Sequence, residues 1–165
     1  MEIEIAYEKS SILCGSCFMT VYLCFRSLDA GELQLPMFVC NEEEETVNNL
    51  FLQCPFARAI WHGSSLGIRT SFLATSSVKQ WVVSAITHKE DSEDNRMLYL
   101  QSLFTILWYI WNHRNLVLHQ GKVPNPKEVL LIAQSCICRY QQVFSLERVQ
   151  NTSTKQQAGE DLHKS

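Results

Sequence analysis

Cysteine is the residue type in this chain whose number and spacing could support chemistry. Seven cysteines are present, and Cys14 and Cys17 form the only Cys-x-x-Cys pair. With Cys40 and Cys54 they would make four thiolates for a tetrahedral zinc, although a long gap separates the pair from Cys40. Alone, Cys14 and Cys17 could perform thiol–disulfide exchange, which would need a preceding strand and a following helix. We favour a third interpretation, two thiols within a hydrophobic segment.

Carboxylates and histidines are not arranged for catalysis. Nucleotide polymerases and ribonuclease H domains hold two divalent metals about 4 Å apart on clustered carboxylates. Of the four aspartates only Asp91 and Asp94 are close in sequence, within a segment rich in other charges. His113 and His119 are about 240° apart around a helix and would not face one ligand. Glycine-rich phosphate loops, Gly-x-Ser-x-Gly and His-Glu-x-x-His are absent. We therefore expect that the protein is not an enzyme.

Composition and charge indicate one globular domain. The 165 residues are 46% hydrophobic and 19% charged, which is enough for a core. The net charge is −3, whereas a free-standing nucleic-acid binder normally has a strongly basic face. An odd number of cysteines without a secretory signal favours a reducing intracellular compartment, nuclear or cytoplasmic. The apolar run 12–25 is too short to cross a bilayer comfortably, so we expect no membrane association.

The hydrophobic pattern predicts a mainly α fold, a small helical bundle. Alternating apolar and acidic residues over 1–7 suggest a short strand, and the run 12–25 fits either a strand or a buried helix. Residues 46–52 have helical spacing, and the glutamates at 42–45 would complement the N-terminus of that helix. Pro55 begins a further helical turn.

Three more helices are predicted beyond a polar connection at 63–76. Ser77 caps the first of them, and a charged loop follows at 88–95. Gly121, in a C-cap position, ends the second, and Asn125 caps the third. The second and third should pair antiparallel because the link between them is short. The predicted core stripe of the third helix is Val129, Ile132, Ala133, Cys136, Ile137, Tyr140 and Phe144.

Two segments carry a resemblance to a known family. Residues 40–61 contain Glu-Thr-x-x-Asn-Leu-Phe, then Cys-Pro-x-Ala and a tryptophan, and residues 107–115 contain Trp-x-x-Arg-Asn. In this order they resemble the zinc-binding domain of plant non-LTR retrotransposon (LINE-type) reverse transcriptases and of putative ribonuclease H proteins. The resemblance covers about 36–147 and implies a degenerate zinc-knuckle-like N-terminal half.

The resemblance also implies a set of zinc ligands. In that family two cysteines on a turn, and a histidine and a cysteine five residues apart on the next helix, hold one structural zinc. Cys40 and Cys54 correspond to two of these ligands, while Met37 and Asn49 occupy the other two positions. Because thioether and amide groups are poor zinc donors, we expect no normal zinc site. Zinc at Cys40 and Cys54 is the alternative.

The function that the resemblance implies is support of nucleic-acid engagement beside catalytic domains. We expect a non-catalytic remnant of the zinc-binding and connector region of a retroelement reverse transcriptase, with RNA or DNA as a weakly bound partner. Arg114 and Asn115 would either fix their helix against a neighbour, which we favour, or contact phosphate. The alternative is a metal-free helical interaction module that self-associates or binds a protein through exposed apolar surface.

The chain divides into four expected segments. An N-terminal segment lies outside the resemblance, and a zinc-binding-like module, a helical connector hairpin and a disordered C-terminal tail follow it. The tail is predicted because it contains almost no large apolar side chains. The bounds are 1–35, 36–88, 89–149 and 150–165.

Overall fold

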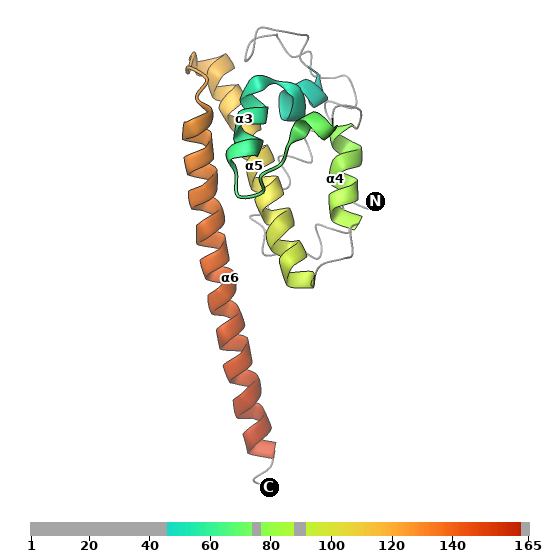
Figure 1. The fold of residues 1–165 in the computed structure, drawn as a ribbon. Helices are drawn as coiled ribbons and strands as arrows, with labels where there is room; N and C mark the ends of the chain where they lie inside the picture. The colour runs from blue at the N-terminus through green and yellow to red at the C-terminus, as the bar shows by residue number, and fades with distance from the viewer. Residues whose placement is uncertain (1–45, 74–76, 88–91, 163–165) are drawn as a thin grey trace.

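The computed structural model describes residues 46–73, 77–87 and 92–162, and every element in them is helical. The mainly α prediction is therefore confirmed, with no strand among these residues (Figure 1). The strand expected at 1–7 and the run 12–25 lie outside the described residues. The elements are a π-helical turn η1 (Asn49–Gln53), α3 (Pro55–Gly63), a short 3-10 helix η2 (Thr70–Leu73), α4 (Val78–Thr87), α5 (Glu93–Gln120) and α6 (Pro126–Leu162).

The long helices α5 and α6 form an antiparallel hairpin, as the short link between them predicts (Figure 1). Gly121 ends α5 in the left-handed conformation with φ 63°, and its N–H donates to the carbonyl of Val117 at 3.1 Å. Asn125 begins α6, because its Oδ1 accepts the N–H of Glu128 at 3.2 Å. Both predicted caps are confirmed, and α4 lies on the opposite side of α5 from α6 (Figure 1).

One predicted boundary is wrong. The loop expected over 88–95 ends early, because Ser92 caps α5 by accepting the N–H of Asn95 at 3.4 Å. α6 runs to Leu162, and the disordered tail expected over 150–165 stays a prediction. Adding residues to a helix costs far less than starting one, so α6 can continue through residues that have little apolar surface to pack. A lack of large apolar side chains predicts few tertiary contacts, and it does not by itself end a helix.

The core joins η1, α3, α4 and α5 around Trp61. Its Nε1 donates to the carbonyl of Phe51 at 2.6 Å, and its ring packs edge-on against Trp81. Asn48 accepts the N–H of Val78 at 2.9 Å and so connects η1 to the start of α4. The largest fully buried side chains are Trp61, Arg114, Phe51, Leu52, Ile60, Leu103, Ile106, Leu107, Ile110, Ile137 and Val78.

The packed side of α6 is narrower than its apolar pattern predicts. Val129, Ala133 and Ile137 are buried at four-residue intervals, whereas Ile132, expected in the same stripe, is 44% exposed. Residues at four-residue intervals form one line along a helix, so the fully buried positions of α6 fall on a single line, with Leu130, Cys136 and Tyr140 half-buried beside it. None of the described helices combines the length and the apolar composition needed to cross a bilayer.

Candidate functional site

The structure describes two of the four positions at which the resemblance implies zinc ligands. Cys54 is buried and caps α3, because its Sγ accepts the N–H of Ala57 at 3.4 Å. Asn49 is also buried, and its carbonyl accepts the N–H of Cys54 at 2.9 Å across the π-helical turn. The backbone therefore holds Asn49 and Cys54 on one turn. Cys40 and Met37 lie outside the described residues, so zinc at Cys40 and Cys54 stays a prediction.

Other candidate residues from the sequence are placed as follows. Cys14 and Cys17 lie outside the described residues. His113 is buried on α5 and stacks on Phe56 at 5.1 Å, whereas His119 is exposed. Within 46–73, 77–87 and 92–162 no three His, Cys, Asp or Glu side chains gather in a way that could hold a metal ion.

Arg114 is 2% exposed and its guanidinium lies over the ring of Trp111, 5.3 Å from the centroid. Its Nη1 donates to Oδ1 of Asn115 at 3.4 Å. A guanidinium enclosed in this way fixes α5 against its surroundings and is not presented to a ligand in solvent. The burial therefore favours the packing interpretation of Arg114 and Asn115 over contact with phosphate.

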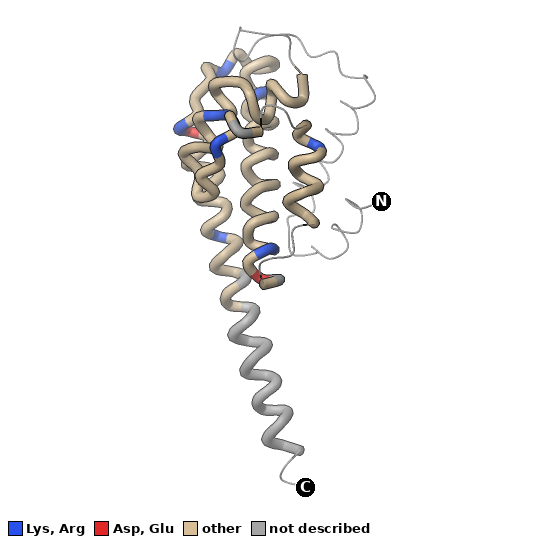
Figure 2. The backbone as a smooth tube through the Cα atoms, turned by 45° about the vertical axis from the view of Figure 1, so that its right-hand side comes forward, with Lys and Arg blue, Asp and Glu red and all other residues tan. Residues whose placement is uncertain are grey.

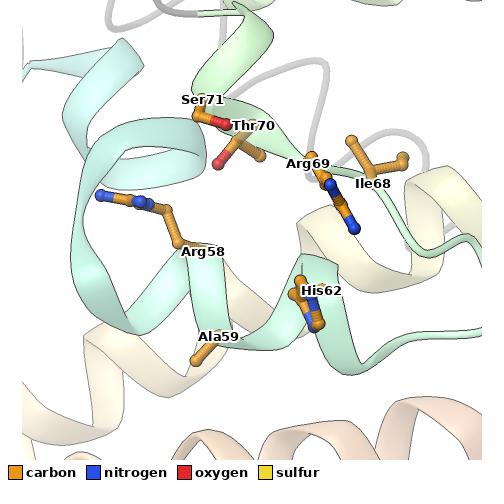
Figure 3. A pocket seen from close by; sticks show the side chains of 7 residues that line it. All are labelled: Arg58, Ala59, His62, Ile68, Arg69, Thr70 and Ser71. Atoms are coloured by element: carbon orange, nitrogen blue, oxygen red, sulfur yellow. The ribbon is translucent and has the colours of Figure 1, made fainter.

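A pocket of about 300 Å³ opens between α3 and the segment that leads into η2 (Figure 3). Arg58 and His62 line it from one face of α3, where a spacing of four residues places them one turn apart. Arg69, Thr70 and Ser71 line it from the other side. Every polar group of this lining is a hydrogen-bond donor or can act as one, and none is a carboxylate.

The side chains around the pocket differ in direction and in exposure. In Figure 3, Arg69 extends toward His62, while Arg58 lies at the other end with its guanidinium directed outward. The hydroxyl of Thr70 points into the space between η2 and α3. The two arginines and His62 are exposed, whereas Thr70 is only 5% exposed. The pocket therefore runs from exposed cationic groups at its mouth to the hydroxyl of the buried Thr70.

A tight turn after α3 brings the chain back over that helix. Ser64 ends α3 with its N–H donating to the carbonyl of Ile60 at 2.9 Å, and its hydroxyl donates to the carbonyl of Trp61 at 2.8 Å. The N–H of Gly67 then donates to the carbonyl of Ser64 at 3.0 Å. Gly67 has φ 56°, a conformation that favours glycine because other residues place Cβ too close to the backbone. This turn places Arg69 opposite α3.

The described segment that lines the pocket is positively charged although the chain as a whole is acidic. Residues 46–87 contain three Lys or Arg and no Asp or Glu. In Figure 2, acidic residues among the coloured part of the tube are seen only near the first turns of α5 and α6. The net charge of −3 for the whole chain does not reveal that this segment is positive. For this reason the sequence analysis does not predict Arg58, His62 and Arg69 as site residues. Net charge calculated over successive stretches of the sequence could have indicated these residues, because 46–87 contains no carboxylate.

Comparison with protein-family models found no match to this chain, and neither curated proteins nor solved structures gave a match. The resemblance to the retroelement zinc-binding domain therefore stays a prediction from residues 40–61 and 107–115. What the described geometry adds is a pocket lined by Arg58 and Arg69, with the hydroxyl of Thr70 at its inner end. Such a pocket is suited to an anion with several oxygen acceptors.

Proposed function

We propose that this chain is a non-catalytic helical module that engages nucleic acid through the pocket between α3 and η2. The observation that carries the proposal is the presence of Arg58 and Arg69 on opposite elements of one pocket, within a segment free of carboxylates. Guanidinium groups form strong, charge-assisted hydrogen bonds with phosphate oxygens. The resemblance to a reverse-transcriptase zinc-binding and connector region supplies the class of ligand, and the pocket supplies a place where that ligand could bind.

The pocket chemistry supports binding without catalysis. Two-metal phosphoryl chemistry needs clustered carboxylates, and the pocket lining contains none. A hydroxyl nucleophile needs a hydrogen-bonded base, and among the described residues no hydrogen bond joins His62 to Thr70 or Ser71. The lining therefore offers donors and positive charge, which position a phosphate without activating a nucleophile against it.

Binding to labelled single-stranded RNA and DNA, measured by fluorescence anisotropy over a series of salt concentrations, tests the proposal. Each phosphate contact contributes about 0.7 to the slope of log affinity against log salt for a single strand. We expect the double variant Arg58→Gln/Arg69→Gln to bind more weakly and to lose about one to one and a half units of this slope. Arg139→Gln, which removes an exposed charge from α6, is the matched control. Binding that is equally strong in the double variant would overturn the proposal.

A second function, a metal-free protein-interaction module, is favoured by the outer face of α6. Leu131 and Leu146 are 72% and 64% exposed, and Ile132 and Val143 lie on the same side of the helix. Large apolar side chains gathered on one exposed face are typical of an association surface. Sedimentation equilibrium of the full chain and of Leu131→Lys/Leu146→Lys tests this function. Association that disappears in the variant supports it, and a wild-type monomer at all concentrations contradicts it.

A further inference from the structure

We propose that the pocket between α3 and η2 takes a terminal phosphate group, a phosphomonoester at a strand end or on a free nucleotide, in preference to a diester within a strand. Such a site deepens the proposed function and rests on it for the class of ligand. It is carried by the number of donors, by the charge and by the shape of the pocket.

The first argument is the match between donors and acceptors. His62 and Arg69 bring N–H groups to the pocket, Thr70 and Ser71 bring hydroxyls, and Arg58 lies at the rim with its guanidinium directed outward. A phosphomonoester has three strongly accepting oxygens and a charge of about −1.5 to −2 at neutral pH. A diester within a strand has a single charge and two free oxygens. These four donor side chains suit the three charged oxygens of a monoester better than the two free oxygens of a diester.

The second argument is charge. Arg58 and Arg69 each bring one positive charge to the pocket lining. Two fixed charges in a segment without carboxylates create a potential that favours a dianion over a monoanion. The attraction to a dianion is about twice that to a diester at the same distance.

The third argument is shape. Arg58 and Arg69 are exposed at the mouth, and the hydroxyl of Thr70 lies at the buried inner end. A terminal phosphate has one attached chain and can turn three oxygens toward Thr70, whereas a phosphate within a strand has two attached chains that must both stay outside the pocket. A volume of about 300 Å³ lies at the lower end of the range for small-molecule pockets. It has room for a phosphate and part of the attached sugar beside Ile68 and Ala59.

The test compares one single-stranded oligonucleotide with a 5′-phosphate and with a 5′-hydroxyl. We expect the phosphorylated form to bind the full-length protein about ten-fold more tightly, because it alone offers the additional charge-assisted hydrogen bonds. Arg69→Gln and His62→Gln should each abolish most of this difference, and Arg139→Gln should leave it unchanged. Circular dichroism checks that each variant is folded, which we expect because the three side chains are exposed.

Titration with adenosine monophosphate and with inorganic phosphate, followed by the amide NMR signals of Thr70 and Ser71, distinguishes the sources of the group. Displacement of the phosphorylated oligonucleotide by equal concentrations of the mononucleotide supports the pocket and assigns it to free nucleotides. A third outcome is that the NMR signals shift with the mononucleotide while neither oligonucleotide binds. This result would support the phosphate pocket and would overturn the proposed function. Equal binding of both oligonucleotides, reduced equally by Arg69→Gln, overturns the terminal-phosphate site and leaves the proposed function in place.

Discussion

Nε2 of His113, on α5, accepts the backbone N–H of Asn125, the residue that caps α6, at 3.2 Å. The imidazole is buried and stacks on Phe56 of α3, so one side chain connects three helices. Only an unprotonated nitrogen can accept this bond, and the hairpin therefore depends on neutral His113.

This contact predicts a stability that depends on pH. Burial lowers the pKa of His113 from its ordinary 6.5, and the nearby Lys122 lowers it further, while Glu128 and a backbone hydrogen bond to Val123 oppose the shift. Because the unfolded chain binds the proton more readily, the free energy of unfolding should fall as pH drops below 6.5 toward the lowered pKa. Urea unfolding at several pH values from about 5 to about 8 measures this dependence of stability on pH. His113→Gln, which does not titrate, should have a flatter profile, and identical profiles would refute the assignment.

The indole of Trp61 should contribute more to stability than that of Trp108. Trp61 donates to a buried carbonyl at 2.6 Å, whereas Nε1 of Trp108 is buried without an acceptor among the described residues. Trp61→Phe removes the N–H that donates to the carbonyl of Phe51 and should cost about 0.5–1.5 kcal/mol beyond the loss of packing. Trp108→Phe removes a donor that already lacks a partner and should cost less. Chemical denaturation of both variants decides this, and a larger loss for Trp108→Phe would contradict it.

Gly67 and Gly121 provide a matched pair for testing the pocket turn. Both have positive φ, 56° and 63°, and at both an added Cβ would meet nothing within 4 Å. Alanine at either position should therefore cost about 1–2 kcal/mol of backbone strain alone. Only Gly67→Ala should also weaken binding of a phosphorylated oligonucleotide, because only Gly67 lies in the turn that places Arg69 opposite α3. Equal binding by both variants would show that the turn does not control the pocket.

Cys54 should act as a helix cap whether or not a metal is present. Cys54→Ala removes the acceptor for the N–H of Ala57 and should destabilise the protein by about 1 kcal/mol, while Cys54→Ser retains an acceptor and should cost less. Because Met37 and Asn49 are poor donors, we expect zinc well below one atom per chain in protein purified without chelator. Elemental analysis measures this. One tightly held zinc per chain, lost in Cys54→Ser, would show that a functional site survives.

Helix ends are the part of the fold that local residues predict well. Ser77 accepts the N–H of Gln80 at 3.1 Å, and its own N–H donates to Oε1 of Gln80 at 3.3 Å, a reciprocal cap contained in four residues. Gly121 and Asn125 act over equally short distances, so their positions were predicted correctly. The start of α5 was missed because its cap, Ser92, lies among charged residues that resemble a loop.

Hydrophobic spacing predicts the structure less well where packing against other helices decides which residues are buried. Apolar spacing predicts a helix over 46–52, and the chain there widens into a π-helical turn that encloses four consecutive buried residues. The same spacing predicts Ile132 in the core, whereas the fully buried positions of α6 fall on a single line that leaves it exposed. Hydrophobic periodicity reports which residues could be buried, whereas the width of the contact is set by the partner helix.

The amino-acid sequence alone determined that this chain is helical and where most of its helices end, because caps and apolar spacing act within a few residues. Its net charge was known as well, yet charge summed over a chain carries no position. Only the tertiary structure brought Arg69 to the pocket that Arg58 and His62 line from α3. That placement requires Gly67 in the left-handed conformation and a turn that returns the chain over α3. A binding pocket depends on distances between segments, and those distances are set when the segments pack.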